Sequence, residues 1–107
     1  MKRIIAPSIL AADFNNLGNV IEMINQSEAE YIHFDVMDGV FVPNISFGIP
    51  VIESVNKIAR KQLDVHLMIV NPDSMIKAFV KAGASIVTVH YEVCTHLNRT
   101  IQYIKKL

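Results

Sequence analysis

The segment Tyr31-Ile-His-Phe-Asp-Val-Met-Asp-Gly-Val-Phe-Val-Pro-Asn44 predicts a β-strand with two different faces, followed by a loop. Side chains alternate between the two sides of a strand, so every second residue shares a face. The apolar face consists of Ile32, Phe34 and Val36. The other face carries His33, Asp35 and Met37, whose side chains include groups that can take part in chemistry. The turn dipeptide Asp38-Gly39 ends the strand. The sequence therefore predicts a functional site at the end of this strand.

The composition is that of a soluble globular domain. The chain has 107 residues, of which 51% are hydrophobic and 19% are charged, and this is too apolar for a disordered segment. Its 10 basic residues balance 10 acidic ones, which gives no electrostatic reason to expect nucleic acid or a membrane surface as a partner. Cys94 has no second cysteine with which to pair, so we expect a reducing, cytoplasmic setting.

Strands and helices are predicted to alternate along the whole chain. Short β-prone runs are followed by apolar residues at helical spacing, and Gly83 suits the end of a helix. The predicted strands are residues 4–8, 31–37, 63–69 and 86–90. The predicted helices begin after Asp13, at Pro50, at Asn71-Pro72 and at Thr95. This order predicts a parallel sheet, because each connection must cross back over the sheet.

A doubly wound sheet and a barrel both fit this order, and the second face of the strands favours a barrel. Central strands of a doubly wound sheet are usually apolar on both faces. Here the second face carries small or polar residues: Ala6 and Ser8, His33 and Asp35, Asp64 and His66, Thr88 and His90. We therefore expect an α/β fold of the TIM (β/α)8 barrel type. Such a barrel has about 250 residues, so residues 1–107 are expected to form the N-terminal half of one barrel domain, a half-barrel of four β/α units.

Polar residues near the carboxyl ends of these strands are expected to converge, because active sites of parallel barrels lie at that end. Two imidazoles and a carboxylate from neighbouring strands, His33, Asp35 and His66, make a candidate divalent metal site. Burying each of them unpaired would cost roughly 1–3 kcal/mol, and a shared ion removes that cost. Met37 and Met68 follow on the same face and would form an apolar wall beside a bound ligand.

Structural roles stay open for several of these side chains. Ser8 could equally end a strand by bonding to the backbone, and Met37 and Met68 could serve only for packing. Asp38 is expected to serve its turn. His90, alone on its strand, is expected to be a core histidine with its hydrogen bond satisfied.

Three motifs resemble successive signatures of the ribulose-phosphate 3-epimerase family. They are Ala6-Pro-Ser-Ile-Leu-Ala-Ala-Asp-Phe14, His33-Phe-Asp-Val-Met-Asp-Gly39 with Phe41-Val-Pro-Asn44, and Asp64-Val-His-Leu-Met68. The resemblance extends from Ile4 to the last helix and includes Ala82-Gly-Ala-Ser85 and His90. Three motifs in fitting order are far more specific than any one of them alone.

The resemblance implies the (β/α)8 fold and an isomerase reaction that interconverts D-ribulose 5-phosphate and D-xylulose 5-phosphate with a bound divalent metal cation. By position, His33, Asp35 and His66 would ligate the metal, and the sequence leaves open whether it is Zn, Fe, Mn or Co. Asp35 would also be one of two catalytic acid/base groups. The substrate would be contacted by Ser8, His66, Met37 and Met68.

The length of the chain departs from the family pattern. The family's second catalytic aspartate and its phosphate-binding loops belong to the other half of the barrel, so we expect the 107 residues alone to be inactive. The first and fourth strands would be unpaired edges, so either the sequence is truncated or two copies associate to close the structure, and we expect a homo-oligomer. Three alternatives stay open: an epimerase for a related ketose phosphate such as allulose 6-phosphate, a non-haem iron oxygenase, and a non-catalytic self-associating half-barrel.

Overall fold

A computed structural model describes residues 3–107 as helices and strands that alternate along the chain. The α-helices are α1 (Leu17–Asn25), α2 (Ile49–Asn56), α3 (Ile76–Ala82) and α4 (Leu97–Lys106). The strands are β1 (Tyr31–Met37), β2 (Gln62–Met68) and β3 (Ala84–Thr88). Short 3-10 turns occur at η1 (Ile9–Ala11), η2 (Phe14–Asn16), η3 (Pro72–Ser74) and η4 (Tyr91–Val93). None of the helices described has the length and apolar character needed to cross a membrane.

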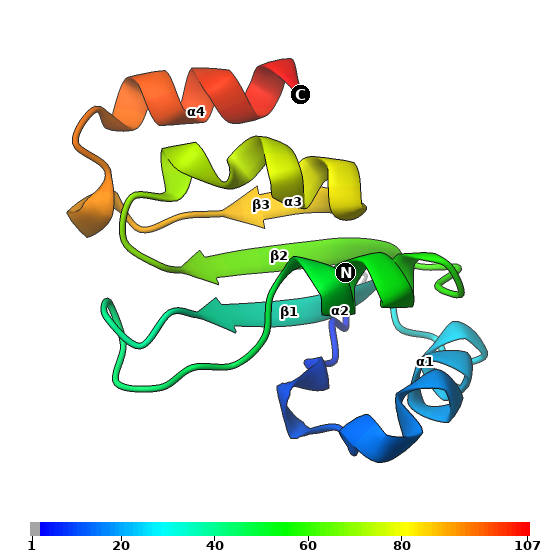
Figure 1. Cartoon of the computed structure of the whole chain (residues 1–107). Coiled ribbons are helices and arrows are strands. Elements are labelled where there is room, and N and C mark those ends of the chain that lie inside the picture. Colours follow the sequence, from blue (N-terminus) through cyan, green and yellow to red (C-terminus); the bar gives the residue numbers. More distant parts are fainter. Residues whose placement is uncertain (1–2) are drawn as a thin grey trace.

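The three strands form one parallel sheet with β2 in the middle. β1 and β2 pair without interruption from Tyr31 opposite Gln62 to Met37 opposite Met68, whereas a register shift interrupts the pairing of β2 with β3. Figure 1 shows the three arrows pointing the same way, with α2 and α3 lying across one face of the sheet. The observed order confirms the parallel α/β arrangement that the sequence predicts.

The apolar faces of the strands form the core under the helices. Phe34 is fully buried, and the ring of Phe47 meets it edge-on with 6.0 Å between ring centroids. Burying a side chain of this size contributes about 1.5–3 kcal/mol to folding. The buried side chains of β1 and β2 are Ile32, Phe34, Val36, Leu63, Val65 and Leu67. The alternation predicted for these strands is therefore confirmed, and the intervening residues lie on the face away from the helices.

The strand predicted at residues 4–8 is not formed. These residues run beside β1, where the His33 amide donates to the Pro7 carbonyl at 2.9 Å and Ser8 makes a single parallel bridge with His33. Pro7 has no amide hydrogen to extend the pairing. Ser8 instead begins η1, because its Oγ accepts a hydrogen bond from the Leu10 amide at 3.2 Å. The described sheet therefore has three strands and one bridged edge segment in place of four strands.

Other boundaries also differ from the prediction. The last strand lies at Ala84–Thr88, so His90 falls in the connection that follows it. Asn71 adopts a left-handed conformation with φ 51° and makes no side-chain cap, and η3 precedes α3. α4 has His96 as its N-cap where Thr95 was expected, a one-residue difference of the size that helix ends commonly show.

Candidate metal centre

The pairing of β1 with β2 places four polar residues on the face of the sheet away from the helices. His33 lies opposite Asp64, and Asp35 lies opposite His66. Residues directly opposite each other on adjacent strands have neighbouring side chains, and residues two apart on one strand share a face. Two register pairs therefore make a compact group of two imidazoles and two carboxylates.

The Asp35 carboxylate is the centre of this group. Its Oδ1 lies 2.9 Å from His33 Nε2 and 3.2 Å from His66 Nδ1. Its Oδ2 accepts a hydrogen bond from Ser8 Oγ at 3.2 Å. The side chains of His33, Asp35 and His66 are 23%, 19% and 24% exposed, so they are reachable from solvent although mostly covered. The structure thus brings together the three predicted metal ligands and Ser8.

Each imidazole has another partner on its second nitrogen. His33 Nδ1 lies 2.8 Å from Asp64 Oδ2, and His66 Nε2 lies 2.7 Å from His90 Nε2. The rings of His66 and His90 are stacked with 4.8 Å between centroids. The prediction that His90 is a core histidine is wrong, because its side chain is 31% exposed and belongs to this polar group. The sequence did hold a signal for this membership: the strand alternation puts Asp64, His66 and His90 on the same face of the predicted sheet.

Proximity to the imidazoles keeps Asp35 ionised. Burial acts to raise the pKa of the Asp35 carboxyl, but the hydrogen bond and charge of His33, with further bonds from His66 and Ser8, hold this pKa below its ordinary value. Burial likewise acts to lower the pKa of His33, and the bonds to Asp64 and Asp35 outweigh it and raise this pKa. The centre therefore combines a carboxylate anion with an imidazole that readily holds a positive charge.

The donor atoms of His33, Asp35 and His66 fit a divalent cation. One ligand atom from each residue can be chosen so that all three lie within 4.8 Å of one another. Nitrogen and oxygen donors of this kind bind first-row divalent metals. A positive ion would replace the proton through which His33 Nε2 bonds to Asp35. The group is a possible metal site, and its donor set does not select one metal.

The two methionines predicted beside the site form the last register pair of β1 and β2. Met37 lies opposite Met68, and both are half-buried. They follow Asp35 and His66 by two residues and so occupy the carboxyl ends of their strands, beside the polar group. Their contact with a substrate stays a prediction.

The loop after β1 is attached to the strand ends by side chains that sequence reasoning did not assign to the site. Ser46 Oγ donates to the Asp35 carbonyl at 2.6 Å and accepts from the Met37 amide at 3.0 Å. Asp38 Oδ2 accepts from the Val70 amide at 2.8 Å and so joins the loops after β1 and β2. These bonds hold the strand ends that carry the polar group.

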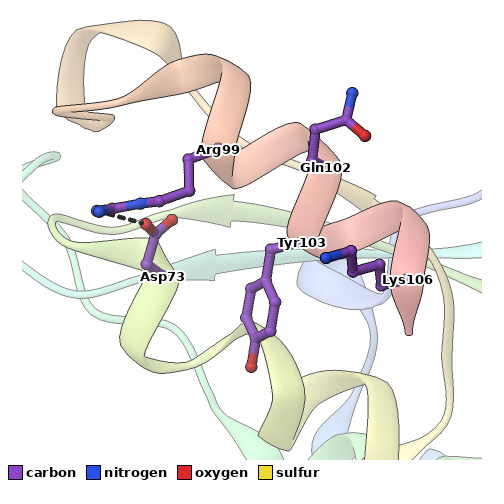
Figure 2. A pocket seen from close by; sticks show the side chains of 5 residues that line it. All are labelled: Asp73, Arg99, Gln102, Tyr103 and Lys106. Atoms are coloured by element: carbon purple, nitrogen blue, oxygen red, sulfur yellow. Dashed lines mark ion pairs between the residues drawn. The ribbon is translucent and has the colours of Figure 1, made fainter.

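The described residues also form surface hollows outside the polar group, and two of the larger ones illustrate their character. One of about 470 Å³ lies at the carboxyl ends of β1 and β2 beside α2, is lined mainly by apolar residues and includes Met37. The other, of about 430 Å³, lies beside α4 and is lined by Asp73, Arg99, Gln102, Tyr103 and Lys106 (Figure 2). Figure 2 shows the Arg99 guanidinium directed at Asp73, with 3.7 Å between Nη2 and Oδ2. Neither hollow is lined by histidine, so the candidate chemistry stays at the centre around Asp35.

Comparisons with known proteins identify the family to which the chain belongs. The model of the ribulose-phosphate 3 epimerase family matches residues 4–107. Ribulose-phosphate 3-epimerase from Bacillus subtilis (strain 168) is 56% identical over 102 residues, which are 95% of this chain and 47% of that protein. The Synechocystis enzyme of the same name is 47% identical over 106 residues, covering 97% of this chain and 46% of that protein.

A plant relative shows the same partial coverage. The chloroplastic ribulose-5-phosphate-3-epimerase of Arabidopsis thaliana is 46% identical over 106 residues, which are 97% of this chain and 38% of that protein. The chain thus spans about half the length of the curated relatives it matches, or less. It belongs to the ribulose-phosphate 3-epimerase family, whose fold is a TIM barrel, and it comprises about half of that barrel.

Proposed function

We propose that the protein containing these residues is a metal-dependent ribulose-phosphate 3-epimerase that interconverts D-ribulose 5-phosphate and D-xylulose 5-phosphate. Family membership and the names of the relatives support an epimerase of a sugar phosphate. The observation that carries the mechanism is the ionised Asp35 carboxylate held between two imidazoles at the carboxyl ends of the strands.

Asp35 is proposed to act as the base at C3 of the substrate. The hydrogen on C3 is acidic because the carbanion formed by its loss is conjugated with the C2 carbonyl. The C3–H bond breaks and its proton passes to the Asp35 carboxylate. The electron pair of that bond forms the C2–C3 double bond, and the C2=O π pair moves onto the C2 oxygen to give an enediolate. A carboxylate can accept this proton because it is ionised at neutral pH, as the lowered pKa of Asp35 requires.

His33, Asp35 and His66 would hold a divalent cation, one of Zn, Fe, Mn or Co, in this reaction. When bound, such a cation supplies Lewis-acid stabilisation of the negative charge that develops on the substrate oxygens. Ser8 and His66 are proposed to contact the substrate from the same face of the sheet. Met37 and Met68 would exclude water from the side of the reacting carbon.

Inversion at C3 needs a second proton donor on the opposite face of the enediolate. Asp64 comes from the same sheet as Asp35, and its Oδ2 is already bonded to His33, so it is not placed to deliver that proton. We therefore propose that the donor comes from the rest of the barrel and that the 107 residues alone are inactive. We further propose a cytoplasmic enzyme that assembles as a homo-oligomer.

A direct test is an assay of ribulose 5-phosphate conversion on the full polypeptide that the natural gene encodes, with Asp35→Asn as the test variant. Asparagine has the size of aspartate but is not a base, so conversion is expected to fall by at least about 100-fold, the lower range for loss of a general base. Asp13→Asn is a matched control, because Asp13 Oδ1 accepts from the Asn15 amide at 3.0 Å and asparagine caps equally well. Full activity in Asp35→Asn would exclude the proposed base.

A further inference from the structure

The two imidazoles of the centre differ in how firmly the structure determines their tautomers. A neutral imidazole has one N–H and one lone pair, and the hydrogen bond made by one nitrogen decides which form the other presents. A nitrogen that would bind a cation must present its lone pair. The partner on the far nitrogen therefore decides whether the near nitrogen is ready to bind.

For His66 the far partner leaves both forms possible. His66 Nε2 faces His90 Nε2 at 2.7 Å, and either of these nitrogens can donate to the other. His90 Nδ1 in turn lies 3.5 Å from Glu92 Oε2. These contacts allow the proton between the two rings to sit on His66 Nε2 or on His90 Nε2, and they do not require either position.

For His33 the far partner determines the form. His33 Nδ1 lies 2.8 Å from Asp64 Oδ2, and a carboxylate anion can only accept a hydrogen bond. Nδ1 must therefore carry a proton. This leaves Nε2, 2.9 Å from Asp35 Oδ1, as the nitrogen whose lone pair is available to a cation when one is bound.

The position of Asp64 is built into the sheet. Asp64 is the direct register partner of His33 in the uninterrupted pairing of β1 with β2. Its side chain is only 18% exposed, and that of His33 is 23% exposed, so water competes poorly for the bond between them. The strands thus orient the His33 ring through Asp64 before any ligand binds.

We propose that Asp64 is a positioning residue of the cation site: by accepting from Nδ1–H it orients the His33 ring and leaves Nε2 as the nitrogen that binds the cation beside Asp35. This inference rests on the proposed function, because it assumes that His33 binds a cation. A carboxylate bonded to the far nitrogen of a ligating histidine orients the ring and makes it a stronger donor to the metal. Loss of such a partner lowers metal affinity by about 10–100-fold.

Zinc binding by the chain itself, measured by calorimetric titration, tests the proposal. Asp64→Ala removes the acceptor and is expected to weaken Zn²⁺ binding about 10–100-fold. Asp64→Asn can still accept from Nδ1–H through its amide oxygen but lacks the charge, so its affinity is expected to lie between those of Asp64→Ala and the unchanged chain. Asp73→Asn is the matched control, because Asp73 is a partly covered carboxylate that bonds to Thr100 on α4, and its Zn²⁺ affinity is expected to be unchanged.

Nitrogen-15 NMR of the zinc-loaded chain supplies a readout that a merely structural role would not move. In the unchanged chain the His33 ring is expected to show a protonated Nδ1 and a zinc-bound Nε2, with the Nδ1 proton protected from exchange. In Asp64→Ala the Nδ1 proton is expected to exchange rapidly or the signals to average. Circular dichroism confirms that each variant is folded, and where Asp64→Ala does not fold the Asp64→Asn result decides.

The possible results separate the two proposals. Tight Zn²⁺ binding by Asp64→Ala with an unchanged Nδ1–H signal, while His33→Ala loses the metal, would overturn the role of Asp64 and leave the cation site standing. Absence of Zn²⁺ binding by the unchanged chain would overturn both the cation site and the role of Asp64. Graded losses in Asp64→Asn and Asp64→Ala together with loss of the Nδ1–H signal support both.

Discussion

Among single residues, Asp38 gives the clearest dependence of stability on pH. Hydrogen bonds from the Val70 amide and from the Val40 and Phe41 amides hold the pKa of Asp38 below its ordinary value. A carboxyl whose pKa is lower in the folded chain stabilises the fold above its unfolded pKa of about 4 and loses this contribution as the pH falls through the folded pKa. We expect Asp38→Asn to lower the melting temperature at neutral pH, and the difference from the unchanged chain to shrink at strongly acidic pH.

Asparagine is an informative replacement at this position. Its amide oxygen can still accept from Val40 and Phe41, while its NH₂ group would face the Val70 amide donor. Asp38→Asn should therefore keep the turn and break the connection between the loops after β1 and β2. Thermal melts followed by circular dichroism from neutral to acidic pH measure this, and a difference in melting temperature that does not change with pH would contradict it.

The residues of the site were only partly predictable from the sequence. Alternation along β1 and β2 was enough to place His33, Asp35 and His66 on one face, because that depends on the strand period alone. Which residue faces which depends on register. A shift of two residues keeps every side chain on its face but would place Asp35 opposite Asp64 in place of His66. The bond between Asp64 and His33 could therefore not be predicted from either strand by itself.

Among the elements, α4 is attached to the rest of the fold by a polar contact. Thr100 is fully buried, and its Oγ1 donates to Asp73 Oδ1 at 2.5 Å in η3. Thr100→Val keeps the shape and removes the donor, so it is expected to lower the free energy of unfolding by about 1.5–3 kcal/mol, as for loss of a hydrogen bond to a charged group. Urea denaturation measures this value.

The exposed ion pair on the same helix is the control for Thr100. Arg99 Nη2 lies 3.7 Å from Asp73 Oδ2, and its side chain is 69% exposed, so Arg99→Gln is expected to change the stability little. A larger loss from Arg99→Gln than from Thr100→Val would mean that the surface charge, and not the buried hydroxyl, attaches α4.

The spacing of apolar residues was enough to predict where the helices and strands lie. Where each one ends depends on local backbone conformation and hydrogen bonding, which this spacing does not reveal. Gly83 ends α3 as predicted, with φ 132° and so little space that an added Cβ would overlap the side chain of Asn56. The segment at residues 4–8 is apolar like a strand, yet Pro7 limits its pairing and Ser8 turns the chain into η1. His90 was misplaced because β3 begins and ends two residues earlier than expected.

In the chain as a whole, the edges of the sheet are the feature most open to a partner. Within residues 3–107, β3 is paired on one side only, and at the other edge the side chains of Ile4 and Ile5 are 61% and 57% exposed. Unpaired edges with apolar side chains favour association with a second copy. We therefore expect the 107 residues, expressed by themselves, to form oligomers with a mass above the 12.0 kDa of one chain, as light scattering during gel filtration would measure.

A charged residue placed on the sheet edge distinguishes association through the edge from nonspecific association through exposed apolar surface. The Ile5 side chain is exposed while its carbonyl accepts from the Glu30 amide, so Ile5→Lys should leave the fold intact and shift the population toward monomer. Met23 on α1 is 65% exposed and lies on a helix, not on the sheet edge, so Met23→Lys should leave the mass unchanged. Equal effects of Ile5→Lys and Met23→Lys would show that the association comes from exposed apolar surface in general. A monomeric unchanged chain would show that the open edges of the sheet need no partner.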